Sequence, residues 1–263
     1  MIFSLFSRCE QIMDIFELEL NKKLNLSHRV WVYSNEVKHL NLVSLEKNTC
    51  QLVKVSTGAR PWFGLYHKSS LMCARHLSFL FIKDTKIIQE DFQKYVKNHV
   101  VFLQTQKSFL SFTANEPYRL IHSDADGLPG ITLDHYGTHR VIQSSSLFGD
   151  FLLPFVSQSL AEIDDLPLYE KSSGQIRKME SLPERVGWIS EKKLENPYVQ
   201  VDFSGVKLSF NLEKCQKTGL FLDQRQNLKF LSELLSFPQN SSFPQDLSFP
   251  QNLSFPQNLS FPQ

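Results

Sequence analysis

The loop at residues 124–130 is the first segment of this sequence whose residue types could do chemistry. Its letters, DADGLPG, resemble part of a calcium-binding loop. If Gly127 took the sixth position of such a loop, the twelfth would be Leu133, where a bidentate glutamate is needed. The calcium interpretation therefore fails. The same glycines and proline are typical of a tight turn, because glycine accepts positive φ and proline stiffens the chain.

Three further candidates also lack the arrangement of residues that their chemistry requires. The stretch QKTG at 216–219 has the residue types of a phosphate loop, but a Walker loop places its glycines before the lysine. Cys215 could be a nucleophile, yet no histidine or aspartate lies nearby in the sequence to activate its thiol. His135 and His139 have a spacing that suits a metal on a helix, but Gly137 between them indicates a turn. The sequence therefore predicts neither a catalytic residue nor a metal site.

Charge and cysteine content narrow the possible classes of protein. Lys and Arg total 28 against 27 for Asp and Glu, so a protein-wide field that attracts nucleic acid is absent. Any RNA binding must then come from local patches. The four cysteines form no CxxC pair, which argues against a zinc site and a secreted disulfide framework. No run reaches the roughly 18 apolar residues that span a bilayer. The sequence favours a cytoplasmic protein.

The first part of the chain predicts a β domain that follows an extension. Residues 1–27 are predicted to be a short docking helix or an ill-ordered extension, because apolar residues recur there at helix-like spacing. These residues are Ile12, Ile15, Phe16 and Leu20. From residue 28 to residue 84 the texture changes to short runs rich in Val, Trp, Tyr and Phe. Several short strands in such a range predict a small barrel or sandwich.

Residues 85–198 predict a separate α+β domain. A helix is predicted from Glu90 to Leu110, where apolar side chains recur every three or four residues. Two strands at 130–136 and 139–145 are predicted to form a hairpin around a two-residue turn. A second helix is predicted from Asp150 to Ile163. It contains a proline at position 154, which is tolerable only within the first helical turn because proline cannot donate a backbone hydrogen bond.

The stretch from 199 to 234 predicts a hairpin and then a helix. Apolar residues alternate along 199–203 and 206–210, on either side of a Ser204-Gly205 turn. Asp223 is placed to cap a helix that starts at Gln224, because its carboxylate can accept bonds from the unpaired amides there. Three leucines are expected to form the buried stripe of this helix: Leu228, Leu231 and Leu235.

Residues 235–263 repeat a six-residue unit that reads LSFPQN in its commonest form. A proline in every unit forbids both a long helix and a central strand. Two explanations stay open. The tail is a true low-complexity, disordered segment, or the reading frame ran into repetitive DNA and lost its natural continuation, which is the explanation we favour.

Two segments resemble a known family closely. Residues 119–143, RLIHSDADGLPGITLDHYGTHRVIQ, are similar to the hallmark segment of the bacterial 23S ribosomal-RNA cytosine-C5 methyltransferases, close to RLVxxEADGLPGLxVDxYG. Residues 216–227, QKTGLFLDQRQN, resemble that family's QKTGFFLDQRxN segment. Weaker similarities occur at 28–37, 66–77 and 168–173, in family order across about 200 residues of the chain.

The resemblance implies a PUA domain at 28–84, a central α+β domain at 85–198, and the start of a class I methyltransferase domain at 199–234. In this family that last domain binds S-adenosylmethionine, and a cysteine within it attacks the cytosine. After Asn227 only 36 residues remain, 29 of them in the repeat, whereas a cofactor domain needs on the order of 150. We therefore expect a C-terminally truncated chain that lacks the catalytic domain and is inactive alone.

The resemblance also implies site residues. Four residues correspond to the segment that lies beside S-adenosylmethionine in complete family members, although we expect this chain to bind none of it: Thr218, Phe221, Gln224 and Arg225. Basic and aromatic side chains of the first domain are predicted to contact ribosomal RNA, because cations neutralise phosphates and aromatic rings stack on bases. These are Arg29, Trp31, Tyr33, Lys54, Arg60, Lys68 and Arg75.

Two functional hypotheses follow for the chain. The first is a remnant of an enzyme that methylated large-subunit ribosomal RNA and that keeps only RNA capture. The second is a stand-alone RNA-binding protein without catalytic activity. A methyltransferase domain encoded immediately downstream in another frame would favour the first.

Overall fold

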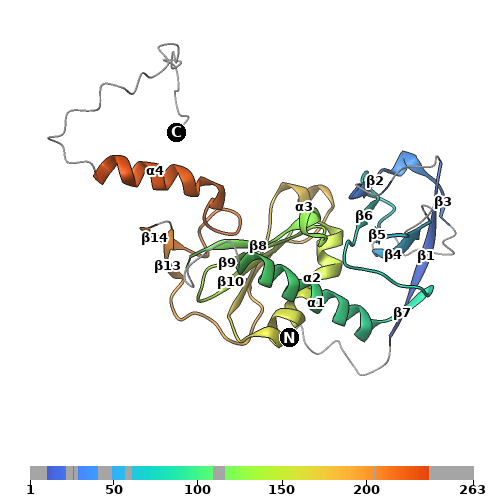
Figure 1. Ribbon diagram of the computed structural model, residues 1–263, viewed down its shortest axis with the longest axis horizontal. Coiled ribbons are helices and arrows are strands. Elements are labelled where there is room, and N and C mark those ends of the chain that lie inside the picture. The colour runs from blue at the N-terminus through green and yellow to red at the C-terminus, as the bar shows by residue number, and fades with distance from the viewer. Residues whose placement is uncertain are drawn as a thin grey trace, which may run out of the picture.

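The computed structural model describes residues 11–21, 26, 29–40, 49–56, 61–108, 116–203 and 205–236. These residues form a seven-stranded, a five-stranded and a two-stranded sheet, combined with helices in a mixed α and β architecture. Figure 1 shows the first sheet at one end of the molecule, the second sheet with helices α1 and α2 in the middle, and helix α4 at the other end. Most of the predicted repeat tail lies outside the described residues.

The first sheet has the strand order β2-β6-β5-β4-β1-β3, and β7 pairs with β1 beside this path. Its strands are β1 (Ile12–Leu20), β2 (Trp31–Val32), β3 (Val37–Leu40), β4 (Gln51–Val55), β5 (Trp62–Tyr66), β6 (Ala74–His76) and β7 (Lys86–Ile88), with the short helix η2 (Ser34–Glu36) between β2 and β3. The β1–β4 pair is parallel, and every other pair in the sheet is antiparallel.

Strand β1 corrects the prediction of a docking helix or an ill-ordered extension at residues 1–27. Ile15 and Leu18 are three residues apart, so along a strand they face opposite sides of the sheet. Each is buried, and the two belong to different apolar clusters. Because β1 is covered on both faces, its apolar residues do not alternate with polar ones, and the spacing resembled that of a helix.

The predicted boundary between residues 84 and 85 also differs from the structure. Strand β7 lies beyond it but pairs with β1 of the first sheet. The largest apolar cluster contains Leu65 from the first sheet, Phe92 from α1 and Ile142 from the second sheet, all of them fully buried. The two sheets are therefore distinct, but they share one core across the expected boundary.

The second sheet has the order β12-β11-β10-β9-β8. Its strands are β8 (Tyr118–His122), β9 (Ile131–His135), β10 (Arg140–Ser144), β11 (Leu168–Ser172) and β12 (Arg185–Trp188). Helix α1 (Gln89–Ser108) precedes the sheet, α2 (Leu147–Ile163) connects the parallel strands β10 and β11, and α3 (Gln175–Met179) lies between β11 and β12. Helices α1 and α2 pack against each other beside the sheet (Figure 1). The predicted hairpin and both predicted helices are present.

One detail of α2 departs from the prediction. The helix begins at Leu147, where the Ser146 side chain accepts a hydrogen bond from the amide of Gly149 and caps it. Pro154 consequently lies inside the helix, beyond the first turn. The predicted start is three residues too late, because the sequence pattern assigns residues 139–145 to a strand and does not identify Ser146 as the cap.

The last described elements pack on the opposite face of the second sheet. They are strands β13 (Tyr198–Phe203) and β14 (Val206–Asn211), the short helix η4 (Leu222–Gln224) and helix α4 (Arg225–Ser236). Val199 and Val201 of β13 are buried in one cluster with Tyr136 and Val141 of the second sheet. Val141 and Ile142 are neighbours on β10, so the sheet is covered on both faces. The predicted β-hairpin is confirmed.

Helix α4 starts one residue later than predicted, and Asp223 lies in the short helix before it. Its apolar side chains are largely uncovered in the described structure. Leu231 is 50% exposed and Phe230 is 60% exposed, while Leu228 is half-buried. Within the described ranges no helix is both long and apolar enough to cross a membrane.

Candidate functional site

The two motif segments meet at a buried carboxylate. Asp134, from the 119–143 segment, is fully buried at the end of β9, and the Arg119 guanidinium donates two hydrogen bonds to it, of 2.8 and 3.0 Å. The Thr218 hydroxyl, 84 residues further along the chain, donates to the second oxygen of Asp134 at 2.5 Å. Thr218 is 2% exposed. The QKTG stretch is thus fixed to the second sheet by a buried, charge-assisted contact.

Tyr136 holds the same stretch from a second direction. Its hydroxyl donates to the Thr218 carbonyl at 3.1 Å and accepts from the Leu220 amide at 3.0 Å. Burial and the nearby Asp134 carboxylate raise the pKa of Tyr136, so the hydroxyl stays protonated and can donate. Gly219 between them has φ +130°, and a Cβ there would lie 2.4 Å from the Tyr136 hydroxyl. The close approach explains why a glycine is needed at this position.

Arg225 anchors the start of helix α4. Its guanidinium forms an ion pair with Glu116 and donates to the carbonyl of Pro117, both just before β8. It also lies over the ring of Phe203, 4.8 Å from the ring centroid. Both ends of the segment from 218 to 225 are therefore held against the rest of the protein.

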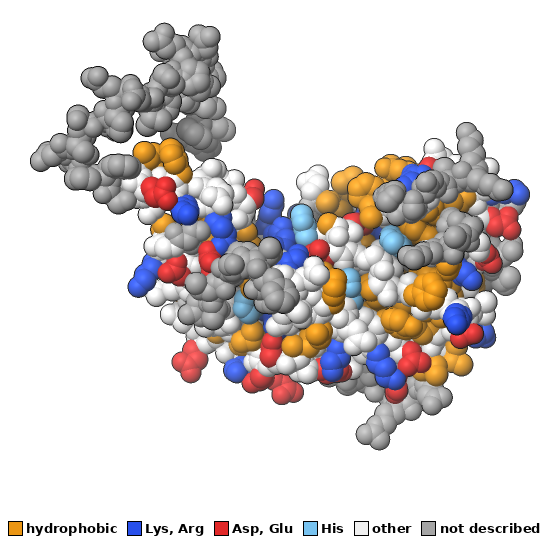
Figure 2. Space-filling view, in the orientation of Figure 1, with side chains coloured by type: hydrophobic (Ala, Val, Ile, Leu, Met, Phe, Trp, Pro, Cys, Tyr) orange, Lys and Arg blue, Asp and Glu red, His pale blue; other side chains and the backbone are white. Residues whose placement is uncertain are grey.

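A cleft of about 580 Å³ lies between this segment and strand β8. Four residues of the second domain line one side: Lys107, Tyr118, Arg119 and His122. The other side is formed by residues 217–223 and 225. In the orientation of Figure 2, Lys and Arg side chains gather below α4, in the middle of the visible face. The cleft thus combines cations, two aromatic rings and one carboxylate.

The charges in the cleft are unequally compensated. Lys107 pairs with Asp126 at 2.8 Å, Arg119 with Asp134, and Arg225 with Glu116. Lys217 differs, since its ammonium lies 5.6 Å from the centroid of the Phe221 ring and has no carboxylate partner among the described residues. Phe221 is 51% exposed. Within the described part of the chain, the Lys217 ammonium is therefore in no ion pair, and both it and the exposed Phe221 ring are accessible to a ligand.

The four residues predicted beside S-adenosylmethionine fall in different surroundings. Thr218, Phe221 and Arg225 line the cleft, whereas Gln224 is exposed and accepts a bond from the Asn227 side chain at 2.7 Å. The Thr218 hydroxyl and the Arg225 guanidinium are already bonded within the protein. Only Phe221 offers an uncommitted surface, so the described residues provide one wall for this cofactor and not an enclosing pocket.

Several predicted RNA contacts of the first domain have partners within the protein. Arg29 forms two hydrogen bonds with Glu36, of 2.9 and 3.1 Å. The Trp31 indole donates to Asp124 at 2.9 Å, and Arg75 forms an ion pair with the same carboxylate at 3.1 Å. Trp31 and Arg75 therefore fasten the first sheet to the DADG turn of the second domain. Their role in RNA binding stays a prediction.

The other members of that predicted surface differ in accessibility. Tyr33 precedes the short helix η2 and is half-buried, as is Lys54 on β4. Lys68 is exposed in the turn after β5. Arg60 lies outside the described residues. Among the described residues of this set, Lys54 and Lys68 are thus the two cations that are at least partly exposed and form no ion pair within the protein.

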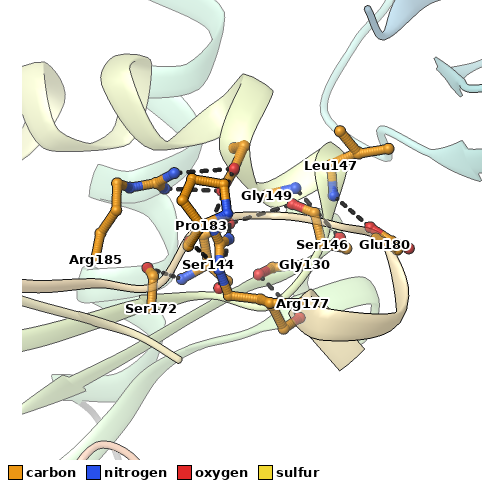
Figure 3. Close-up of polar contacts among 12 residues, drawn as sticks. Gly130, Ser144, Ser146, Leu147, Gly149, Ser172, Arg177, Glu180, Pro183 and Arg185 are labelled. Carbon is orange, nitrogen blue, oxygen red and sulfur yellow. Dashed lines mark hydrogen bonds and ion pairs between the residues drawn. The ribbon is translucent and has the colours of Figure 1, made fainter. Parts of the chain in front are cut away.

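A second polar cluster surrounds Asp150 on α2 and is closed. Its carboxylate accepts from the Ser144 hydroxyl at 2.5 Å and from the guanidinium groups of Arg177 and Arg185, at 2.7 to 3.2 Å. Arg185 also donates to Glu170 at 2.8 Å. Figure 3 shows Arg177 and Arg185 converging on the start of α2, next to Ser144. Every charge here is paired, which is typical of a structural cluster.

The two histidines flank a turn, as the sequence predicts. His135 ends β9 and His139 precedes β10, with Gly137 between them at φ +76°. His139 is fully buried and its ring stacks on Tyr136, 5.2 Å between centroids. Burial lowers the pKa of both histidines to about 4. Among the described residues, no group of three or more metal-binding side chains occurs.

Cys215 contacts a buried lysine that the sequence did not single out. The Lys171 ammonium lies 3.0 Å from the Cys215 sulfur and donates to the Leu212 carbonyl at 2.9 Å. It also bonds the carbonyl of Cys215 itself. These contacts tie β11 to the turn after β14, so the pair fixes the start of the 216–225 segment.

The chain is similar in sequence to curated proteins of known name. No family model matches the chain. "Ribosomal RNA large subunit methyltransferase I" from Aeromonas hydrophila is 27% identical over 217 residues, covering 81% of this chain and 53% of the relative. The protein of the same name from Vibrio cholerae is 36% identical over 121 residues, covering 44% and 30%. Both of these relatives carry the name of a ribosomal RNA large subunit methyltransferase. The chain spans about half the length of the first of them.

Solved structures agree on the fold. A Streptococcus mutans protein assigned as a SAM-dependent methyltransferase superposes with a TM-score of 0.58 at 20% identity, over 83% of this chain and 54% of that one. A second protein assigned as a methyltransferase, solved as a complex with SAH, gives the same TM-score at 21% identity, over 83% of this chain and 53% of that one. At these identities the likeness is one of fold.

Proposed function

We propose that the chain is the RNA-recognising part of an S-adenosylmethionine-dependent methyltransferase of large-subunit ribosomal RNA. The observation that carries this is the extent of the similarity, which spans 217 residues and 81% of the chain in a protein of that name. The contact between Asp134 and Thr218 supports it, because it joins the two segments that resemble the 23S cytosine-C5 family. On this proposal the first sheet is a PUA domain, the target is C5 of a cytosine, and the protein works in the cytoplasm.

The described residues favour RNA capture over methyl transfer. Their sheets are mainly antiparallel, with parallel pairing between β1 and β4 and between β10 and β11 alone. A nucleotide-type cofactor is bound at the carboxyl ends of an open, mostly parallel sheet, which these residues do not form. Since Phe221 is the one uncommitted surface that the predicted cofactor residues offer to S-adenosylmethionine, the proposal assigns RNA capture, and not methyl transfer, to the described residues.

RNA binding is tested by measuring dissociation constants for fragments of large-subunit and small-subunit ribosomal RNA over a range of salt. We expect micromolar or tighter binding, with at least a tenfold preference for a large-subunit fragment. A linear fall of affinity with the logarithm of salt concentration is expected if lysines and arginines neutralise phosphates. Equal binding of all fragments, or none of any, would contradict the proposal.

A methyl-transfer assay tests the division of labour in the proposal, and RNA preference separates the proposal from its alternative. With radioactive S-adenosylmethionine and undermethylated ribosomal RNA, we expect the chain alone to incorporate no label. Substitutions in the cleft should then change the affinity for RNA but not the incorporation of label, which is absent already. If label is incorporated, the described residues hold a complete active site and the proposed division of labour is wrong. If the chain binds RNA of any origin equally, the stand-alone RNA-binding protein becomes the better description.

A further inference from the structure

We propose that the cleft between β8 and residues 217–225 holds one unpaired nucleotide of the RNA, with its base stacked on Phe221 and its phosphate beside Lys217. This inference rests on the proposed function and adds the place and the manner of binding. It moves the principal RNA contact from the first sheet, where the sequence predicts it, to the junction of the two motif segments.

The charges point to an anion. Three of the four Lys and Arg side chains that line the cleft are paired with carboxylates behind them. Their guanidinium and ammonium groups still present N–H donors to the cleft wall, but their charge is compensated. Among the described residues that line the cleft, Lys217 is the cation without an ion pair and Asp223 is the carboxylate without one, so the place that favours an anion is beside Lys217 and not the cleft as a whole. A phosphate is therefore expected beside Lys217, with the exposed imidazole of His122 as a second donor on the opposite side.

The exposed ring points to a base. Phe221 is half-exposed although it lies between Leu220 and Leu222 in a segment otherwise held down at both ends. Aromatic side chains that project into a basic groove are stacking platforms for unpaired bases, and they tolerate any base because each has a flat face. Bases within an A-form helix hide these faces against their neighbours. The occupant is therefore a nucleotide from a single-stranded loop or bulge.

The backbone beside the ring is also unusual. Lys217 has φ +49°, a left-handed backbone conformation that residues other than glycine seldom adopt. Its ammonium lies 5.6 Å from the centroid of the Phe221 ring. Strain of this kind persists where surrounding contacts fix it, and here Thr218 is fixed by Asp134 and Leu220 by Tyr136. The cation and the ring are thus held together before any ligand arrives, which lowers the entropic cost of binding.

The experiment measures fluorescence anisotropy of a labelled 12-nucleotide oligouridine with the full chain. Phe221→Ala is expected to raise the dissociation constant about tenfold, which is the size of one lost base stack. Phe221→Tyr should retain most of the affinity. Lys217→Glu is expected to raise the constant by a similar factor and to reduce the salt slope by about 0.7, the loss of one phosphate contact on a single strand.

Two variants serve as matched controls. Phe102→Ala removes another exposed phenylalanine, on α1 and 52% exposed, and Lys193→Glu makes the same charge reversal in an exposed loop outside the cleft. Both are expected to change the dissociation constant by less than twofold. Circular dichroism of each variant confirms that it is folded. A duplex RNA of the same length should bind at least tenfold more weakly than the single strand.

The outcomes separate the inference from the proposed function. If the cleft variants bind like their controls while Lys54→Glu and Lys68→Glu lose affinity, the chain binds RNA but not in this cleft. If excess SAH displaces the oligonucleotide, the cleft is a cofactor site and the inference is wrong. If the unmodified chain binds no RNA, both the inference and the proposed function fall.

Discussion

Two regions of this protein use arginine and carboxylate side chains in opposite ways. Around Asp150, two arginines and a serine surround one carboxylate, and a second carboxylate takes the remaining donor of Arg185. In the cleft beside β8, similar pairs line the walls, but Lys217 has no carboxylate partner among the described residues and lies beside the exposed ring of Phe221. Complete pairing indicates a structural role, and an unpaired cation beside an exposed ring indicates a role in binding.

The pKa of Asp150 shows how strongly the closed cluster is stabilised. Burial alone would raise the pKa of this carboxyl, but hydrogen bonds from Arg185, Arg177 and Ser144 outweigh burial and lower it to about 2. The ionised form is therefore favoured in the folded protein relative to the unfolded chain. This contribution is present above the unfolded pKa near 3.8 and is lost as the pH falls through about 2.

Breaking the closed cluster should have the largest effect. Asp150→Ala leaves Arg177, whose side chain is 1% exposed, as a buried charge without its carboxylate. We expect the free energy of unfolding in urea to fall by about 3–5 kcal/mol. The control is Asp165→Ala, which removes an exposed ion pair with Lys192 and should cost less than about 1 kcal/mol. Similar losses for the two variants would mean that the cluster is no more important than a surface pair.

Low pH should destabilise the protein through His139, whose ring stacks on Tyr136 next to the cleft. Because burial lowers the pKa of His139 to about 4, the unfolded chain binds protons between pH 6.5 and 4 that the folded protein does not. Stability therefore rises with pH across this window. Between pH 7 and pH 5 we expect a loss of about 2 kcal/mol from His139, after integration of the shift.

The variant His139→Phe tests this assignment, because phenylalanine keeps a ring stacked on Tyr136 but cannot be protonated. Urea unfolding curves at pH 7 and pH 5 should then differ by about 2 kcal/mol less than those of the unmodified chain. His135, whose pKa burial also lowers to about 4, should contribute a further part of the same dependence. An unchanged pH dependence in the variant would assign the acid sensitivity to other groups.

The fit of the 217–225 segment can be tested at a single glycine. Gly219→Ala places a Cβ 2.4 Å from the Tyr136 hydroxyl, at φ +130°. Gly174→Ala is the matched control, since Gly174 has φ +121° and nothing within 4 Å of the added atom. We expect Gly219→Ala to be less stable than the control by about 1–2 kcal/mol, because its neighbours must move. It should also weaken RNA binding, whereas the control should not.

The elements that the sequence predicted correctly have local causes. The hairpins of β9 with β10 and of β13 with β14 follow from alternation around a short turn, and α1 follows from its three- and four-residue periodicity. Strand β1 was missed because Ile15 and Leu18 face different cores, which removes the alternation. The shared core between the two sheets was missed for a related reason, since Leu65 and Ile142 are far apart in the chain.

The sequence predicted which segments form the site but not how they contact each other. The resemblance marked both motif segments, but nothing local shows that the Thr218 hydroxyl bonds Asp134 across 84 residues of chain. Lys217 and Tyr136 stood inside the quoted motifs without a role. The basic and aromatic residues of the first domain were named because cations neutralise phosphates and aromatic rings stack on bases. Composition could not reveal that Asp124 already binds both Trp31 and Arg75.

The smallest expected effect concerns the cations left free on the first sheet. Lys54→Glu and Lys68→Glu remove positive charge from the surface that the sequence predicts for RNA, without breaking an ion pair of the described structure. We expect each to raise the dissociation constant for single-stranded RNA by about twofold to threefold, less than Lys217→Glu, because Lys217 is held beside the Phe221 ring, where a stacked base would keep the phosphate in place. Arg75→Gln is the contrasting variant, since it breaks the pair with Asp124 and should lower stability while leaving RNA affinity within twofold. Anisotropy titrations at two salt concentrations, with urea unfolding of the same samples, measure both quantities. A loss of affinity at Lys54 or Lys68 larger than that at Lys217 would return the principal RNA contact to the first sheet.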